Sequence, residues 1–292
     1  FSTYRSNINL AEVALDPAPP GPAKWLTQDS ARGELAPAYS PDGRRIAYFS
    51  NRKGAERESI WVMGADGSNP ALVVEDDRVN VLPRWSGEED LVYSSIRRVL
   101  DPSDRHLRRV SVSGGKPQIY ALSVDPLWGD VATDGRLVAR APNGGLQVFD
   151  PRTGQTQKLD RVSSPGLKWS PDGRRFSYAR APGRADDPQA GLWLDEFSGQ
   201  PRLLFRGWVV WHSWTGQEEL LVLEGKPDLN GVLWRVRPDG SRTRLAATLR
   251  LLHTYWISLP YTRFDASPDG RRMVTEALEV HDADIGMMEN IP

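Results

Sequence analysis

The sequence contains no cysteine, which excludes disulfide bridges and thiol catalysis but leaves the redox compartment open. No apolar run approaches the roughly 18 residues of a membrane-spanning helix, so we expect this segment not to insert into a bilayer. The Gly-x-Ser-x-Gly elbow of α/β-hydrolases is missing, and none of the four histidines has metal-ligand spacing to another. The formal net charge is −1, which argues against a nucleic-acid partner.

Turn-forming residues and large aromatics are abundant: 26 glycines, 23 prolines and 11 tryptophans, as is typical of many short strands joined by turns. The motif Ser-Pro-Asp-Gly-Arg-Arg occurs at Ser40–Arg45, Ser170–Arg175 and Ser267–Arg272, each time between apolar runs. Proline presets φ at the second position of a tight turn, aspartate suits the third and glycine accepts the positive φ that follows. Each copy therefore predicts a β-hairpin.

Weaker copies of the motif fill the gaps between the clear ones. Aligned on the turn serine, the repeats fall at residues 40, 86, 132, 170, 215 and 267, with spacings of 46, 46, 38, 45 and 52. The first unit contains four strand-like runs: Pro37–Ser40, Arg45–Ser50, Ser59–Met63 and Ala71–Val74. A period near 45 with four strands per unit is the pattern of propeller blades.

We therefore predict an all-β fold, a six-bladed β-propeller forming a single domain over residues 1–292, with seven blades as the alternative. The blades are expected to start near residues 37, 83, 128, 165, 209 and 261. The last unit offers three strands, the third ending near Asp284–Met288, and so lacks an outer strand. Asn9–Val13 and Ala23–Thr27, which read as third and fourth strands, are orphans within residues 1–30. Because an exposed sheet edge is a liability, we expect this N-terminal segment to close the ring on the C-terminal blade.

This pattern resembles the PD40 (WD40-like) repeats of TolB-like β-propellers, with the best matches at Ala38–Tyr48, Lys168–Tyr178 and Asp265–Thr275. TolB has an extra α/β domain ahead of its propeller, and nothing in this sequence reads as one. Similar repeats occur in prolyl-oligopeptidase-type and tricorn-type peptidases, and what this sequence shares with all of them is the propeller.

The loops differ in length between the two faces of the predicted disc. The turns within hairpins are short, whereas the other connections, such as 51–58, 97–105 and 180–191, are long and irregular. Loops on a rigid scaffold often carry binding sites, so we expect binding at the channel mouth on the long-loop face, although tolerated insertions or a water-filled channel would look the same. The candidate binding residues precede the inner strands: Glu34, Asn80, Asp125, Trp211, His212, His253, Tyr255 and Arg263.

No catalytic constellation is recognisable, and we expect no metal or cofactor. Gly114-Gly115-Lys116 lacks phosphate-loop spacing and reads as a turn, and His281–Asp284 reads as a solvated loop rather than a metal site. Trp85, Trp169 and Trp214 recur at one repeat position, which favours packing between blades.

The sequence thus predicts a non-catalytic propeller that binds a protein or peptide. The chain begins at Phe1 within a strand-like run, so we expect a piece of a larger bacterial chain, its sensor or scaffold part, that works in the periplasm or elsewhere outside the cytoplasm. The alternatives are the gating propeller of a peptidase and a carbohydrate-active propeller with its site in the channel.

Overall fold

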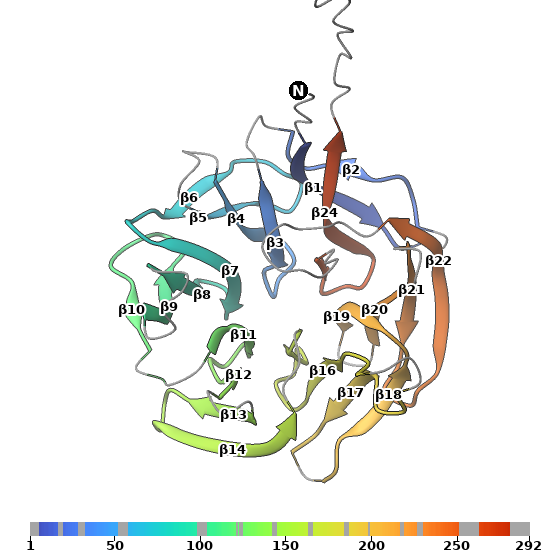
Figure 1. Ribbon diagram of the computed structural model, residues 1–292. Coiled ribbons are helices and arrows are strands. Elements are labelled where there is room, and N and C mark those ends of the chain that lie inside the picture. The colour runs from blue at the N-terminus through green and yellow to red at the C-terminus, as the bar shows by residue number, and fades with distance from the viewer. Residues whose placement is uncertain are drawn as a thin grey trace, which may run out of the picture.

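The computed structural model describes residues 6–16, 20–28, 33–51, 58–97, 104–120, 122, 125–141, 145–162, 166–183, 187–197, 199–216, 219–226, 230–250 and 263–280. Over these residues the regular elements are strands, and they form six four-stranded antiparallel sheets around a central axis (Figure 1). The prediction of an all-β, six-bladed propeller is confirmed, and the seven-bladed alternative is wrong.

Five of the blades are each built from four consecutive strands, the first of which lies next to the axis (Figure 1). Blade 1 contains β3 (Glu34–Tyr39), β4 (Arg45–Ser50), β5 (Ser59–Gly64) and β6 (Ala71–Val74). Blade 2 contains β7 (Val79–Ser86), β8 (Asp90–Ile96), β9 (Arg105–Ser111) and β10 (Gln118–Ile119), and blade 3 contains β11 (Asp125–Val131), β12 (Leu137–Arg140), β13 (Gly145–Asp150) and β14 (Gln155–Val162). Blade 4 contains β15 (Lys168–Trp169), β16 (Phe176–Arg180), β17 (Gly191–Asp195) and β18 (Arg202–Arg206), and blade 5 contains β19 (Val209–Gly216), β20 (Glu219–Gly225), β21 (Asn230–Val236) and β22 (Arg242–Arg250).

Blade 6 is shared between the two ends of the chain. Its inner strands are β23 (Phe264–Ala266) and β24 (Arg272–Val280), and its outer strands are β1 (Ser6–Ala14) and β2 (Lys24–Trp25). β1 pairs with β24 over its whole length, from Ser6 opposite Val280 to Ala14 opposite Arg272 (Figure 1). The predicted closure by the N-terminal segment is confirmed.

One detail of that prediction is wrong. The third strand of blade 6 was assigned to the end of the chain near Asp284–Met288, but β1 occupies the third place, directly beside β24. Residues 281–292 lie outside the described residues, and so does the His281–Asp284 loop. The N-terminal segment therefore supplies the third and fourth strands, which uses up the strands that had allowed a seventh blade.

The Ser-Pro-Asp-Gly turns have the geometry expected from their residues. In the first copy, Gly43 has φ of 70°, and the Ser40 hydroxyl donates to the Asp42 carboxylate at 2.5 Å. The same carboxylate accepts the backbone N–H of Arg44 at 3.0 Å, while Ser40 Oγ accepts that of Arg45 at 2.9 Å. Both other copies repeat these bonds, so the motif closes each hairpin through its own side chains.

Over the described residues, the hydrophobic core consists of six clusters, one at each interface between neighbouring blades. Trp85, Trp169 and Trp214 belong to three of them, so the prediction that these side chains pack between blades is confirmed. Several arginines complete the packing by lying over an aromatic ring of the next blade, with Cζ 5.0–6.0 Å from the ring centroid: Arg45 over Trp85, Arg136 over Trp169, Arg175 over Trp214, and Arg272 over Tyr39. The last of these contacts joins blade 6 to blade 1.

Candidate functional site

A hollow of about 280 Å³ lies in the central channel, at the end where the Ser-Pro-Asp-Gly turns are found. All six blades contribute to it through the last residues of their inner strands and the turns that follow. One residue of each blade, two positions before the turn serine or its equivalent, lines this hollow, and we call these six residues the channel ring: Ala38, Arg84, Asp130, Lys168, Ser213 and Asp265.

Strand alternation explains why this repeat position faces the channel. Successive side chains of a strand point to opposite faces, and the residue after each ring member, such as Trp85 or Trp214, is buried in an interface between blades. In blades 1 and 2 a register shift precedes the ring residue, at Ala36 and Leu82, which have φ of 50° and 56°. Such bulges re-aim the side chains that follow them.

The two ring aspartates brace neighbouring blades. Asp130 of blade 3 accepts the backbone N–H of Trp169 of blade 4 at 2.7 Å, and Asp265 of blade 6 accepts that of Tyr39 of blade 1 at 2.8 Å. The second oxygen of Asp265 accepts the Ser213 hydroxyl at 2.5 Å. Both carboxylates therefore act within the structure, as fixed acceptors for inner strands.

The ring cations are held less tightly than the aspartates. Arg84 Nε lies 3.7 Å from the Asp130 carboxylate, and Arg84 Nη1 donates to the Leu82 carbonyl at 3.1 Å. Lys168 Nζ lies 5.5 Å from the ring centroid of Trp211, a cation–π distance. Burial lowers the pKa of the Arg84 guanidinium and raises the pKa of the Asp130 carboxyl, while Lys168 and Arg84 oppose the rise at Asp130.

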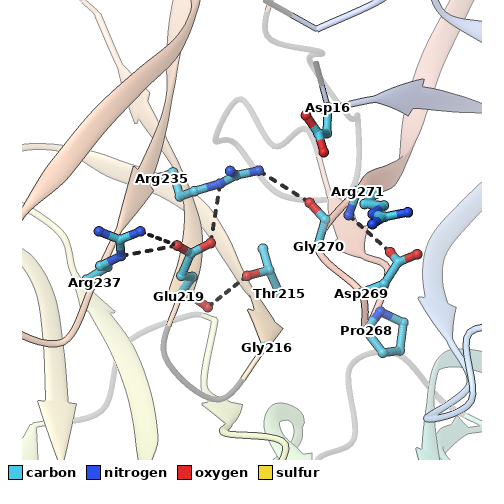
Figure 2. A pocket seen from close by; sticks show the side chains of 10 residues that line it. All are labelled: Asp16, Thr215, Gly216, Glu219, Arg235, Arg237, Pro268, Asp269, Gly270 and Arg271. Carbon is cyan, nitrogen blue, oxygen red and sulfur yellow. Dashed lines mark hydrogen bonds and ion pairs between the residues drawn. The ribbon is translucent and has the colours of Figure 1, made fainter. Parts of the chain in front are cut away.

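A second hollow, of about 500 Å³, opens beside the channel between blades 5 and 6. Figure 2 shows Glu219 between two arginines: Arg237 Nη2 lies 3.0 Å and Arg235 Nε 3.5 Å from its carboxylate. Asp16, Asp269 and Arg271 lie on the opposite side, so charges of both signs line the hollow (Figure 2). Thr215 and Pro268 line both hollows, so this second hollow adjoins the channel mouth.

The predicted binding residues differ in burial and in position along the inner strands. Glu34, Asn80 and His212 are fully buried in inner strands, and the Asn80 amide donates to Asp76 at 2.8 Å and to the Arg78 carbonyl at 3.2 Å. Asp125 begins β11, whereas His253 and Tyr255 lie outside the described residues. A binding role for these residues stays a prediction.

The structure brings two of the predicted residues, Trp211 and Arg263, into contact. Arg263 Cζ lies 5.8 Å from the Trp211 ring centroid, and the indole N–H donates to the Phe264 carbonyl at 2.8 Å. Beside them, the buried Glu276 accepts the backbone N–H of Ala36 at 2.8 Å and that of Arg263 at 3.3 Å. Burial raises the pKa of Glu276, and Arg263 opposes that rise.

His212 forms a buried pair with Ser177 of the neighbouring blade. The distance from His212 Nε2 to Ser177 Oγ is 2.8 Å, and both side chains are fully buried. A serine–histidine pair could serve nucleophilic catalysis, but a substrate cannot reach a hydroxyl with no exposed surface. Burial, together with repulsion from Lys168, lowers the pKa of His212 to about 3, so the imidazole is neutral and joins blades 4 and 5.

We expect His212 to make the fold acid-sensitive. Its pKa in the unfolded chain is near 6.5, so below that pH the unfolded state binds a proton that the folded state does not bind. The free energy of unfolding should fall by up to about 1.4 kcal/mol per pH unit from pH 6.5 towards pH 3. Urea unfolding between pH 4.5 and 7.5 should give a shallower pH dependence for His212→Gln than for the wild-type protein. Equal slopes for His212→Gln and wild type would contradict this assignment.

Sequence reasoning missed the channel ring. It chose residues that precede the inner strands, and it favoured the long-loop face, where segments 52–57, 98–103 and 184–186 lie outside the described residues. The alignment on the turn serine could have revealed the ring, because four of its six positions hold charged residues next to buried aromatic or apolar ones.

The described residues form neither a metal site nor a membrane-spanning helix. No group of three or more histidine, aspartate or glutamate side chains there is arranged to hold a metal ion. That part of the chain also contains no helix long and apolar enough to cross a bilayer.

Comparison with solved structures shows the same fold in TolB proteins. No protein-family model matches the sequence, and no curated protein matches it. The protein assigned as TolB from Agrobacterium tumefaciens has a TM-score of 0.67 and 14% identity, with 96% of this chain and all of that chain covered. TolB from Acinetobacter baumannii has a TM-score of 0.59 and 12% identity over 94% of this chain, which spans 64% of that protein. A prolyl endopeptidase structure has a TM-score of 0.51 and 17% identity, over 93% of this chain and 45% of that one.

Proposed function

We propose that this TolB-like propeller is a non-catalytic domain that binds a peptide or a peptide segment of a protein, as the sensor or scaffold part of a larger bacterial chain outside the cytoplasm. The observation that carries the proposal is the channel hollow, which all six blades line at the turn face. A hollow of about 280 Å³ is near the lower limit for ligand pockets, so it suits one or two side chains of a bound segment.

The surroundings of the hollow support a peptide ligand. Pro41, Pro171 and Pro268 of the three Ser-Pro-Asp-Gly turns line it, as do Trp85 and Trp214. Rigid proline surfaces bind extended chains at low entropic cost, because they lose little freedom on binding. The adjoining hollow between blades 5 and 6 gives the rest of a segment a polar surface with charges of both signs (Figure 2).

Panning a random dodecapeptide library displayed on phage tests this proposal. We expect peptides that bind the wild-type protein and bind Ala38→Phe at least about tenfold more weakly, because Ala38 is the smallest ring residue and a phenyl group there fills much of the hollow. Ala71→Phe is the matched control, since Ala71 is exposed on the outer strand β6. Failure to recover any peptide, or binding that Ala38→Phe leaves unchanged, would contradict the proposal.

The likeness to prolyl endopeptidase supports a second candidate, the gating propeller of a peptidase, since the chain matches 45% of that enzyme. Labelling of the full-length natural protein by a fluorophosphonate serine-hydrolase probe separates the two functions. Labelling would favour the peptidase, and its absence would favour the binding domain.

A further inference from the structure

In the channel hollow, the anionic side chains have more of their hydrogen-bonding capacity satisfied than the cationic ones. Both oxygens of Asp265 accept hydrogen bonds, and Asp130 accepts a backbone N–H while lying beside Arg84. By contrast, the Lys168 ammonium, with three donors, contacts the Trp211 ring and interacts electrostatically with Asp130, but it has no hydrogen-bond acceptor among the described residues. Arg84 has five donors, and one of them is used at hydrogen-bond distance within the described chain.

A third cation, Arg263, lies near the first two, with the buried Glu276 carboxyl beside it. Arg263 lies close enough to Arg84 for their repulsion to lower the pKa of Arg84, and it shares the Trp211 ring with Lys168. Asp130 interacts electrostatically with both Arg84 and Lys168, so the two cations lie near the same carboxylate. The unused donors of Lys168 and Arg84, in a confined site, favour an anionic ligand.

The form of that ligand follows from the size and lining of the hollow. The prolines of the Ser-Pro-Asp-Gly turns present apolar surface to it, while the ring presents the cations. A ligand with an apolar or extended body and one anionic head matches this arrangement. A bound metal cation does not match it, because the ring carboxylates are already committed to backbone and hydroxyl donors.

We propose that the channel hollow binds the carboxylate of an aspartate or glutamate side chain of the partner peptide, with Lys168 and Arg84 as the groups that contact it. This inference rests on the proposed peptide-binding function and names the chemistry that the peptide carries into the channel. Lys168 supplies a flexible point charge and Arg84 a planar donor fork suited to a carboxylate.

The peptides selected by panning test the inference directly. We expect them to be enriched in aspartate and glutamate over the unselected library. A synthetic peptide from the selection should bind at least about tenfold more weakly when its acidic residue becomes the amide, and by a similar factor to Lys168→Met. The two changes together should cost little more than either one, because both remove the same contact.

Three further variants serve as controls for charge and fold. Lys168→Arg keeps the charge and should keep most of the affinity, and Arg84→Met should weaken binding of the acidic peptide more than of its amide. Lys116→Met, at an exposed site in blade 2, should leave affinity unchanged, and thermal unfolding checks that each variant folds. Selected peptides could bind Ala38→Phe weakly, yet show no enrichment in acidic residues and bind Lys168→Met as well as wild type. That result would overturn the inference and leave the proposed function standing. If no peptide binds at all, both fall.

Discussion

Leu10→Ala is expected to lower the free energy of unfolding by about 2–5 kcal/mol. Leu10 lies in β1, the strand that the N-terminus adds to blade 6, and its side chain is fully buried between blades 6 and 1 with Tyr48 and Val274. Truncation leaves a cavity at the junction where the ring closes. Urea unfolding followed by tryptophan fluorescence measures the loss.

Ala14→Ser is the control for this prediction. Ala14 belongs to the same strand and pairs with Arg272, but it is exposed. A surface substitution of this kind should change stability by less than about 0.5 kcal/mol. Wild-type stability for Leu10→Ala would mean that β1 contributes little to closing the propeller.

Trp85→Ala is expected to cost about 3–5 kcal/mol of stability. The Trp85 side chain is 6% exposed, packs between blades 1 and 2, and lies under the Arg45 guanidinium at 5.0 Å. Its indole N–H also donates to the Ala38 carbonyl of blade 1 at 2.9 Å, a bond worth about 1 kcal/mol. The substitution therefore removes packing, a cation–π contact and a hydrogen bond between blades.

The comparison variant is Trp193→Ala in β17. Trp193 is partly buried, and its indole N–H donates to the Gln189 carbonyl within the same blade. We expect it to cost clearly less than Trp85→Ala by chemical denaturation, because less surface is lost and no bond between blades is broken. An equal cost for the two would contradict the larger role assigned to the more deeply buried Trp85 and its bond to the neighbouring blade.

The architecture could be predicted from the sequence because its signals are local. A Ser-Pro-Asp-Gly turn satisfies its own backbone through Ser40 and Asp42, so six residues are enough to recognise a hairpin. The spacing between copies of that turn then predicts where each blade begins. The unpaired strands at the N-terminus predict that the ring is closed by their pairing with the last blade, since an unpaired sheet edge needs a partner.

The channel was harder to predict because its contacts join residues far apart in the chain. Glu276 reaches the backbone N–H of Ala36 across the closure, and Asp265 reaches that of Tyr39. Ala36 and Leu82 have positive φ although neither is glycine and each precedes a proline, so no local rule indicates the bulge that re-aims the ring. The burial of His212 against Ser177 likewise depends on how two blades meet.

The absence of cysteine makes the closure directly measurable. Ala11 lies opposite Thr275 in the pairing of β1 with β24, so a cysteine at each position places two thiols side by side from opposite ends of the sequence. Mild oxidation of the native Ala11→Cys, Thr275→Cys protein, followed by non-reducing electrophoresis and mass spectrometry, should give one intramolecular disulfide that reduction reverses. Thiols that stay free, or that link only separate molecules, would contradict a ring closed by the N-terminal strand.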